Sequence, residues 1–277
     1  MVNTTANSSA ILTVEQVGDL IVRPVTNDSI AAQVSKVVNT SSSSYRVPIV
    51  TADPTAAWVA EGQEIAADDL DLTELDITFS KLAGLTVISS ELAADSSPEA
   101  AQEVGAGLSR DLVRKVDQAY FGALAAPAPS GLGALSGITA VSAGAAYTNL
   151  DPFAEAIAKA EEVGATVGAF VTTPAVALTL AKLKVQTGSN QQLLGTDPTS
   201  PTSRTISGVP LLVSPTIAAN TVWAIPRDRA LFVLRNGAEV TTDGSVFFTS
   251  DRIAVRAKLR VGFGFPHPAA IVKITTT

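Results

Sequence analysis

The stretch AAWVAEGQEIAADDLDLTELDITFSK, residues 56–81, decides how the rest of the chain is interpreted. Apolar residues alternate in it with acids and threonines, and this period of two predicts extended strand. The alternating apolar positions are Leu70, Leu72, Leu75, Ile77 and Phe79. They change from even to odd numbers at Thr73–Glu74, which indicates a bulge or a turn between two strands.

The same stretch is strongly acidic. Its acids are Glu61, Glu64, Asp68, Asp69, Asp71, Glu74 and Asp76. Its one base, Lys81, stands at the end. A strand with this many charges borders solvent or lies against a surface of opposite charge, so the question is what covers its apolar side.

Bulk composition describes a globular chain. With 277 residues, of which 46% are hydrophobic and 16% charged, it can bury the core of one large or two modest domains. A net charge of −7 argues against a broadly basic surface that wraps nucleic acid, but leaves room for one basic face. No apolar run reaches the roughly 20 residues of a membrane helix, and the sequence MVNTTANSSA at the start lacks a signal-peptide pattern. We therefore expect no membrane partner.

Patterns along the chain indicate an α+β fold, with strands and helices in blocks. Residues 1–45 are rich in serine and threonine and predict an extended arm with little structure of its own. A capping residue followed by proline predicts three helices, beginning at Ser97–Pro98, Asp151–Pro152 and Thr173–Pro174. The first is expected to run to about Leu124 and, at 1.5 Å per residue, to be roughly 40 Å long.

Catalytic and metal-binding patterns are missing from the sequence. There is no cysteine, and the single histidine, His267, stands between prolines without an orienting carboxylate. GLGALSG at residues 131–137 has the wrong spacing for a dinucleotide loop. We therefore predict no catalytic residue, no cofactor and no metal, and no enzymatic activity.

One basic pattern is the complement of the acidic stretch. Arg256, Lys258 and Arg260 recur at spacing two, so they share one face of a strand whose other face is apolar. A second candidate patch consists of Arg110, Arg114 and Lys115 on the long helix. These bases either face solvent or pair within one chain, or they meet the acidic stretch across a subunit boundary, where charge fixes register and partner choice.

Several short motifs, taken in order, resemble the major capsid proteins of tailed double-stranded-DNA phages with the Hong Kong 97 fold. They are WVAEG at Trp58–Gly62, DITFSK at Asp76–Lys81, SSEL at Ser89–Leu92 and PAAIVK at Pro268–Lys273. The resemblance implies an N-terminal arm (1–45), an extended E-loop (46–92), a peripheral domain (93–150 and 235–277) and an axial domain (151–234). It also implies that the E-loop, with Trp58, Phe79 and Lys81 among its residues, lies over a neighbouring subunit.

The resemblance further implies a shell subunit rather than an enzyme. Its partners would be other copies arranged as pentamers and hexamers, packaged double-stranded DNA held without sequence specificity, and portal, scaffolding and decoration proteins. It would be assembled in the host cytoplasm and reside in the virion.

Some relatives seal the shell with an isopeptide bond between a lysine near the E-loop tip and an asparagine of the peripheral domain. Here the tip has no lysine, Asp251 stands where the asparagine is expected, and Lys258 stands near the place of the promoting carboxylate. We therefore expect a shell without covalent cross-links.

Two alternatives stay open at this stage. The same fold could form an encapsulin-type compartment that encloses an enzyme instead of a genome. From a different class, the acidic cluster could serve a small hydrolase or binding domain.

Overall fold

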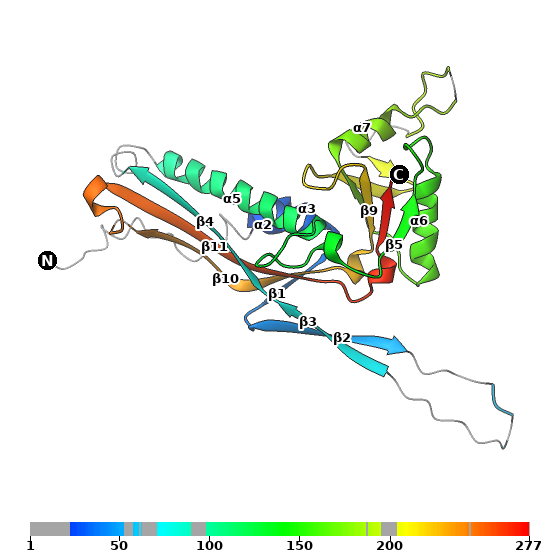
Figure 1. The fold of residues 1–277 in the computed structure, drawn as a ribbon, viewed down its shortest axis with the longest axis horizontal. Helices are drawn as coiled ribbons and strands as arrows, with labels where there is room; N and C mark the ends of the chain where they lie inside the picture. Colours follow the sequence, from blue (N-terminus) through cyan, green and yellow to red (C-terminus); the bar gives the residue numbers. More distant parts are fainter. Residues whose placement is uncertain are drawn as a thin grey trace.

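The computed structural model describes residues 23–52, 58–60, 62, 71–89, 98–186, 188–194, 204–243 and 245–276. These residues form a long four-stranded sheet, a six-stranded sheet at one end of it, and a two-stranded ribbon that projects from the junction (Figure 1). The predicted α+β class is confirmed.

The four-stranded sheet has the order β1-β10-β11-β4. Its strands are β1 (Lys36–Thr40), β10 (Leu231–Asp243), β11 (Arg252–Gly264) and β4 (Ser80–Ser89). β1 runs parallel to β10, while β11 is antiparallel to both of its neighbours, β10 and β4. The edge strands β1 and β4 both lead into the ribbon, because β2 follows β1 and β4 follows β3.

The helix α5 (Pro98–Phe121) lies along one face of this sheet (Figure 1). Leu112, Val116 and Tyr120, which are spaced four apart and so lie on one side of the helix, are buried. The helix begins at the predicted proline but ends at Phe121, before the expected Leu124. Gly122 follows directly, and glycine commonly ends helices.

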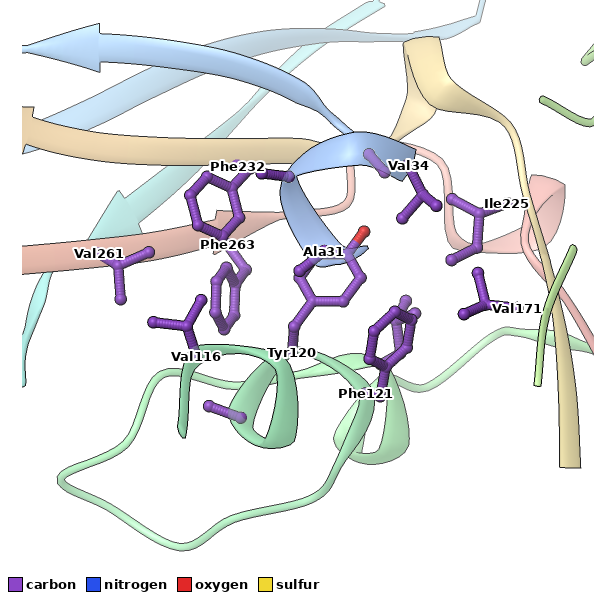
Figure 2. Packing of buried hydrophobic residues seen from close by; sticks show 14 of the residues in the cluster. Ala31, Val34, Val116, Tyr120, Phe121, Val171, Ile225, Phe232, Val261 and Phe263 are labelled. Atoms are coloured by element: carbon purple, nitrogen blue, oxygen red, sulfur yellow. The ribbon is translucent and has the colours of Figure 1, made fainter. Parts of the chain in front are cut away.

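Aromatic side chains build the centre of the main core. Tyr120 is fully buried, and its ring meets those of Phe121, Phe263 and Phe265 edge to face, with centroids 5.0–5.5 Å apart. Val171 and Ile225 of the six-stranded sheet join the same cluster (Figure 2). This cluster therefore holds the two sheets together.

The predicted extended arm is wrong for residues 23–40. Residues 23–40 form α2 (Arg23–Asp28), α3 (Ile30–Val34) and β1, and Val25, Ala31 and Val34 are buried in the main core. The serine-rich composition predicted little structure, but these few apolar residues pack against α5. The arm's first 22 residues lie outside the described part of the chain.

A buried carboxylate fastens this segment to α5. Asp117 accepts hydrogen bonds from the Ser29 hydroxyl at 2.6 Å and from the backbone N–H groups of Ala31 and Ile30 at 3.0 and 3.3 Å. These are donors at the start of α3 that no turn of the helix can satisfy. Burial raises the pKa of the Asp117 carboxyl, although the three hydrogen bonds act in the opposite direction. One turn further along, the Tyr120 hydroxyl bonds the Ser35 hydroxyl at 2.7 Å.

The six-stranded sheet has the order β5-β12-β9-β6-β8-β7 and carries two helices. Its elements are β5 (Thr139–Ser142), β6 (Ala169–Thr172), β7 (Thr205–Ile206), β8 (Val209–Val213), β9 (Thr221–Ile225) and β12 (Val272–Thr275), with α6 (Asp151–Glu162) and α7 (Pro174–Lys182). Thr173 caps α7 as predicted by accepting from the Val176 N–H at 3.3 Å. Asp151 is instead the first residue of α6, whose N-cap position is Leu150.

The division into arm, E-loop, peripheral domain and axial domain stays a prediction. The sheets cross its expected bounds at two places. β5 and β12, placed in the peripheral region, belong to the six-stranded sheet, and β10 of the four-stranded sheet begins four residues before position 235. Short 3₁₀ turns at Leu132–Ala134, Arg227–Arg229, Phe248–Ser250 and Pro268–Ala270 complete the described elements.

The ribbon consists of β2 (Ser44–Ala52) and β3 (Asp71–Thr78), paired antiparallel. Its base crosses the second face of the four-stranded sheet, opposite α5, where Ile77 is buried with Leu231 and Val233. Two glycines of β11 make room for it. A Cβ on Gly262 would lie 2.7 Å from the Thr78 carbonyl oxygen, and one on Gly264 would overlap Ile77.

The bulge or turn predicted at Thr73–Glu74 is not found there, because β3 runs through this position without a break. The register shifts instead between Val50 and Ala52 of the opposite strand. The change of apolar positions has another cause. Leu75 and Ile77 face the chain's own sheet, whereas Leu72 lies on the outer side of the ribbon.

Replacing Asp117 with alanine should lower the free energy of unfolding by about 2–4 kcal/mol, because buried donors at the start of α3 lose their acceptor. Urea denaturation of the isolated chain measures this loss, with Asp111→Ala, an exposed acid of the same helix, as the control. A loss below about 1 kcal/mol, no greater than the control's, would contradict the role given to Asp117.

Replacing Gly262 with alanine should cost about 1–3 kcal/mol, since the backbone of Thr78 has to move away from the added methyl group. Gly144→Ala is an informative comparison, because that glycine has open space but a positive φ of 71°. Hydrogen exchange should show faster exchange at the base of the ribbon in Gly262→Ala alone. Unchanged exchange there would mean that the close crossing does not hold the ribbon.

Candidate functional site

The ribbon presents an outer side that its own chain leaves uncovered. Val50 and Leu72 are directly opposite in register and are 40% and 59% exposed. Trp58, in the short described piece beyond β2, is fully exposed. An isolated two-stranded ribbon is marginally stable in water, so exposed apolar side chains at its far end indicate a surface that meets a partner.

Only some of the predicted acids belong to the described residues. Glu74 and Asp76 are exposed on the outer side of β3, on the same face as Leu72. Asp71 begins β3. Glu61, Glu64, Asp68 and Asp69 lie outside the described residues. The outer side of the ribbon is therefore acidic and apolar together.

One ion pair crosses the ribbon itself. Arg46 of β2 lies 3.7 Å from the Glu74 carboxylate, and both side chains are about two-thirds exposed. An exposed pair of this kind contributes about 0–1 kcal/mol. Asp76 lies directly opposite the same Arg46, so this one base stands beside two acids.

The predicted basic stripe is found on β11 as expected. Arg256 is exposed and Lys258 and Arg260 are half-buried, whereas Ala257, Leu259 and Val261 of the other face pack under α5. The stripe therefore lies on the second face of the sheet, the face that the ribbon base crosses. Lys258 has an interaction partner within the chain.

Two residues assigned to the acidic loop belong to the body instead. Phe79 packs beside Ile77 at the ribbon base, and Lys81 lies in β4, directly opposite Arg260. The next strand adds Arg235 opposite Arg260 on the other side. The sequence did not reveal this row, because Lys81, Arg235 and Arg260 come together only through the pairing of β4, β10 and β11.

Arg256 has an acid of its own chain nearby. The hydroxyl and the backbone N–H of Ser245 hold the pKa of the Asp243 carboxyl below its usual value, and the Arg256 guanidinium adds to this lowering. Of the two interpretations of the basic stripe, pairing within one chain therefore fits Arg256, which has Asp243 nearby, better than it fits Arg260.

The second basic patch lies on the opposite side of the layer. Arg110, Arg114 and Lys115 are exposed on α5, away from the side that buries Leu112 and Val116. Arg110 has an interaction partner within the chain. Because α5 and the sheet separate the two patches, they cannot act as one continuous surface.

Nothing in the described residues adds a chemical site. His267 is half-buried beside Arg229, and burial followed by that positive charge lowers the pKa of its imidazole. Across the described ranges, no group of three or more metal-binding side chains occurs. No helix within those ranges is long and apolar enough to cross a membrane.

Comparisons with known proteins follow the fold. A chain of Microbacterium phage Oxtober96 has a TM-score of 0.75 at 20% identity, covering 90% of this chain and 91% of that one. The capsid of an empty GTA particle, computed with C5 symmetry, has a TM-score of 0.73 at 20% identity and 90% coverage of both chains. A chain of Gordonia phage Cozz has a TM-score of 0.69 at 19% identity, covering 90% and 86%. These likenesses show a shared fold.

The family comparison reaches further than the fold. No curated protein matches the sequence. The model of the phage capsid family matches residues 10–276, which is nearly the whole chain. The comparisons do not favour the encapsulin-type compartment or the small hydrolase. The chain belongs to the phage capsid family and is a capsid protein of the virion shell.

Proposed function

We propose that this major capsid protein builds its shell by laying the acidic ribbon of one copy over the basic sheet face of the next. The observation that carries the proposal is the division of the ribbon into two sides. Its inner side is covered by its own sheet through Ile77, while Leu72, Glu74 and Asp76 face outward without cover.

The partner that fits the ribbon is another copy of the chain. The stripe of Arg256, Lys258 and Arg260 supplies the opposite charge on the exposed sheet face. Charge complementarity between two such surfaces directs the encounter and fixes the register more than it adds affinity. Repeating the contact around a symmetry axis produces a closed ring of copies.

The wider set of partners follows from this role. Copies arranged as pentamers and hexamers would close the shell, which would hold double-stranded DNA without sequence specificity. The C5 symmetry belongs to the GTA capsid named above and is consistent with such rings. Portal, scaffolding and decoration proteins would act on the assembled shell, and assembly would take place in the host cytoplasm.

We also propose that the contact stays non-covalent. The stretch from Glu61 to Asp76 has no lysine, so it offers no nucleophilic amine for such a bond. Mature particles boiled in detergent should therefore release the chain at 28.4 kDa. A ladder of multiples of that mass on a denaturing gel would contradict a non-covalent shell.

Reversing the basic stripe should stop assembly while the subunit stays folded. Arg256→Glu with Arg260→Glu places acids where the acidic ribbon is expected to bind, and like charges at an interface oppose association. Sedimentation and negative-stain microscopy should then show subunits without shells, and circular dichroism should match that of the wild type.

A matched control is Lys182→Glu, a reversal of an exposed base on α7, far from the stripe. That variant should form shells in normal yield. Shells of normal yield and diameter from the double variant would show that the stripe is not the surface that binds the ribbon.

A further inference from the structure

Three like charges lie side by side on the uncovered face of the four-stranded sheet. Arg235 of β10 is paired in register with Arg260 of β11, which is paired in turn with Lys81 of β4. Residues directly opposite in adjacent strands share a face. Because strands lie about 4.8 Å apart, the row spans roughly 10 Å.

The described residues of the chain do not neutralise the row. Among the described residues, none forms an ion pair with Lys81, Arg235 or Arg260. Like charges directly opposite one another destabilise a sheet. A row of this kind in an otherwise well-packed sheet therefore indicates that an anionic group occupies it in the functional state.

The described part of the chain's own ribbon does not supply that group. Its base lies over Gly262 and Gly264, the positions that follow Arg260 on the same face of β11. It makes this contact through Ile77, so Glu74 and Asp76 point away from the sheet they would have to reach. Among the described residues, therefore, no acid neutralises the row, and a second copy of the chain can supply one.

The exposed surface beside the row is apolar. Leu85 and Val87 follow Lys81 on the same side of β4 and are 63% and 39% exposed. Lys81 and Leu85 are four residues apart, as are Asp76 and Leu72 on the ribbon, and four residues of strand span about 13 Å. One charge and one leucine are thus spaced alike on both surfaces.

From this match we infer that Asp76 of a second copy binds the row of Lys81, Arg260 and Arg235 while its Leu72 packs on Leu85. This inference rests on the proposed function and gives it a register. β3 of the second copy then runs antiparallel to β4, and its Glu74 lies above Lys258, midway between the two contacts. A nucleic-acid phosphate would satisfy the charges but would leave Leu85 and Val87 uncovered.

A charge exchange tests the pairing in the full chain. Arg260→Glu and Asp76→Arg should each reduce the yield of shells at least tenfold, measured by sedimentation and negative-stain microscopy. Combining both with Lys81→Gln and Arg235→Gln, which remove the two remaining positive charges of the row, restores opposite charges between copies and should recover at least half of the wild-type yield. Arg260→Glu combined with Lys182→Glu is the matched double control and should not recover.

Neutralising the row separates its two effects. Arg260→Gln should raise the melting temperature of the unassembled subunit, because it removes repulsion, and should lower the salt concentration at which shells dissociate, because it removes the attraction for Asp76. Lys182→Gln should change neither quantity. A lower melting temperature, or unchanged salt resistance, would overturn the inference.

The outcomes also separate the inference from the proposed function. If the wild-type chain forms no shells, the proposed function fails. If the wild type assembles but the charge exchange gives no recovery, this register is wrong. Normal shells of Arg260→Gln that hold less nucleic acid would likewise overturn it, in favour of a phosphate-binding row.

Discussion

The crossing of the ribbon over Gly262 and Gly264 is the contact on which the arrangement of the whole surface depends. It buries the inner side of the ribbon through Ile77 and thereby turns Glu74 and Asp76 outward. The same crossing stops at the point where the row of Lys81, Arg260 and Arg235 begins. A single packing constraint thus leaves one acidic surface, in which Glu74 pairs with the exposed Arg46 of its own ribbon, and one basic row that no described residue neutralises.

The two sheets and α5 form a packed core from which the ribbon projects. α5 closes one face of the four-stranded sheet, and the aromatic cluster around Tyr120 joins that sheet to the second one. Asp117 and Tyr120 hold the segment that becomes β1, which in turn leads into the ribbon. The chain belongs to the phage capsid family, and a capsid shell is built by repeating one subunit and its contacts through symmetry.

The sequence predicted the features that depend on local pattern. The alternation on β11, the start of α5 at Pro98 and the cap of α7 at Thr173 all follow from spacing and capping chemistry. The features it missed depend on contacts between distant segments. Residues 23–40 were predicted to have little structure, because their packing against α5 cannot be inferred from local sequence. The place of Arg235 beside Arg260 depends on the pairing of β10 with β11. The acids at 61–69, which lie outside the described residues, stay a prediction.

The absence of cysteine from the sequence allows a direct measurement of whether the ribbon of one copy reaches the sheet face of another. Copies carrying only Leu72→Cys are assembled with copies carrying only Leu85→Cys, and the particles are treated with a short bismaleimide. The account predicts a linked heterodimer in assembled particles and none in unassembled subunits, since each link must join two different copies. Shells that form normally but yield no such heterodimer would contradict it.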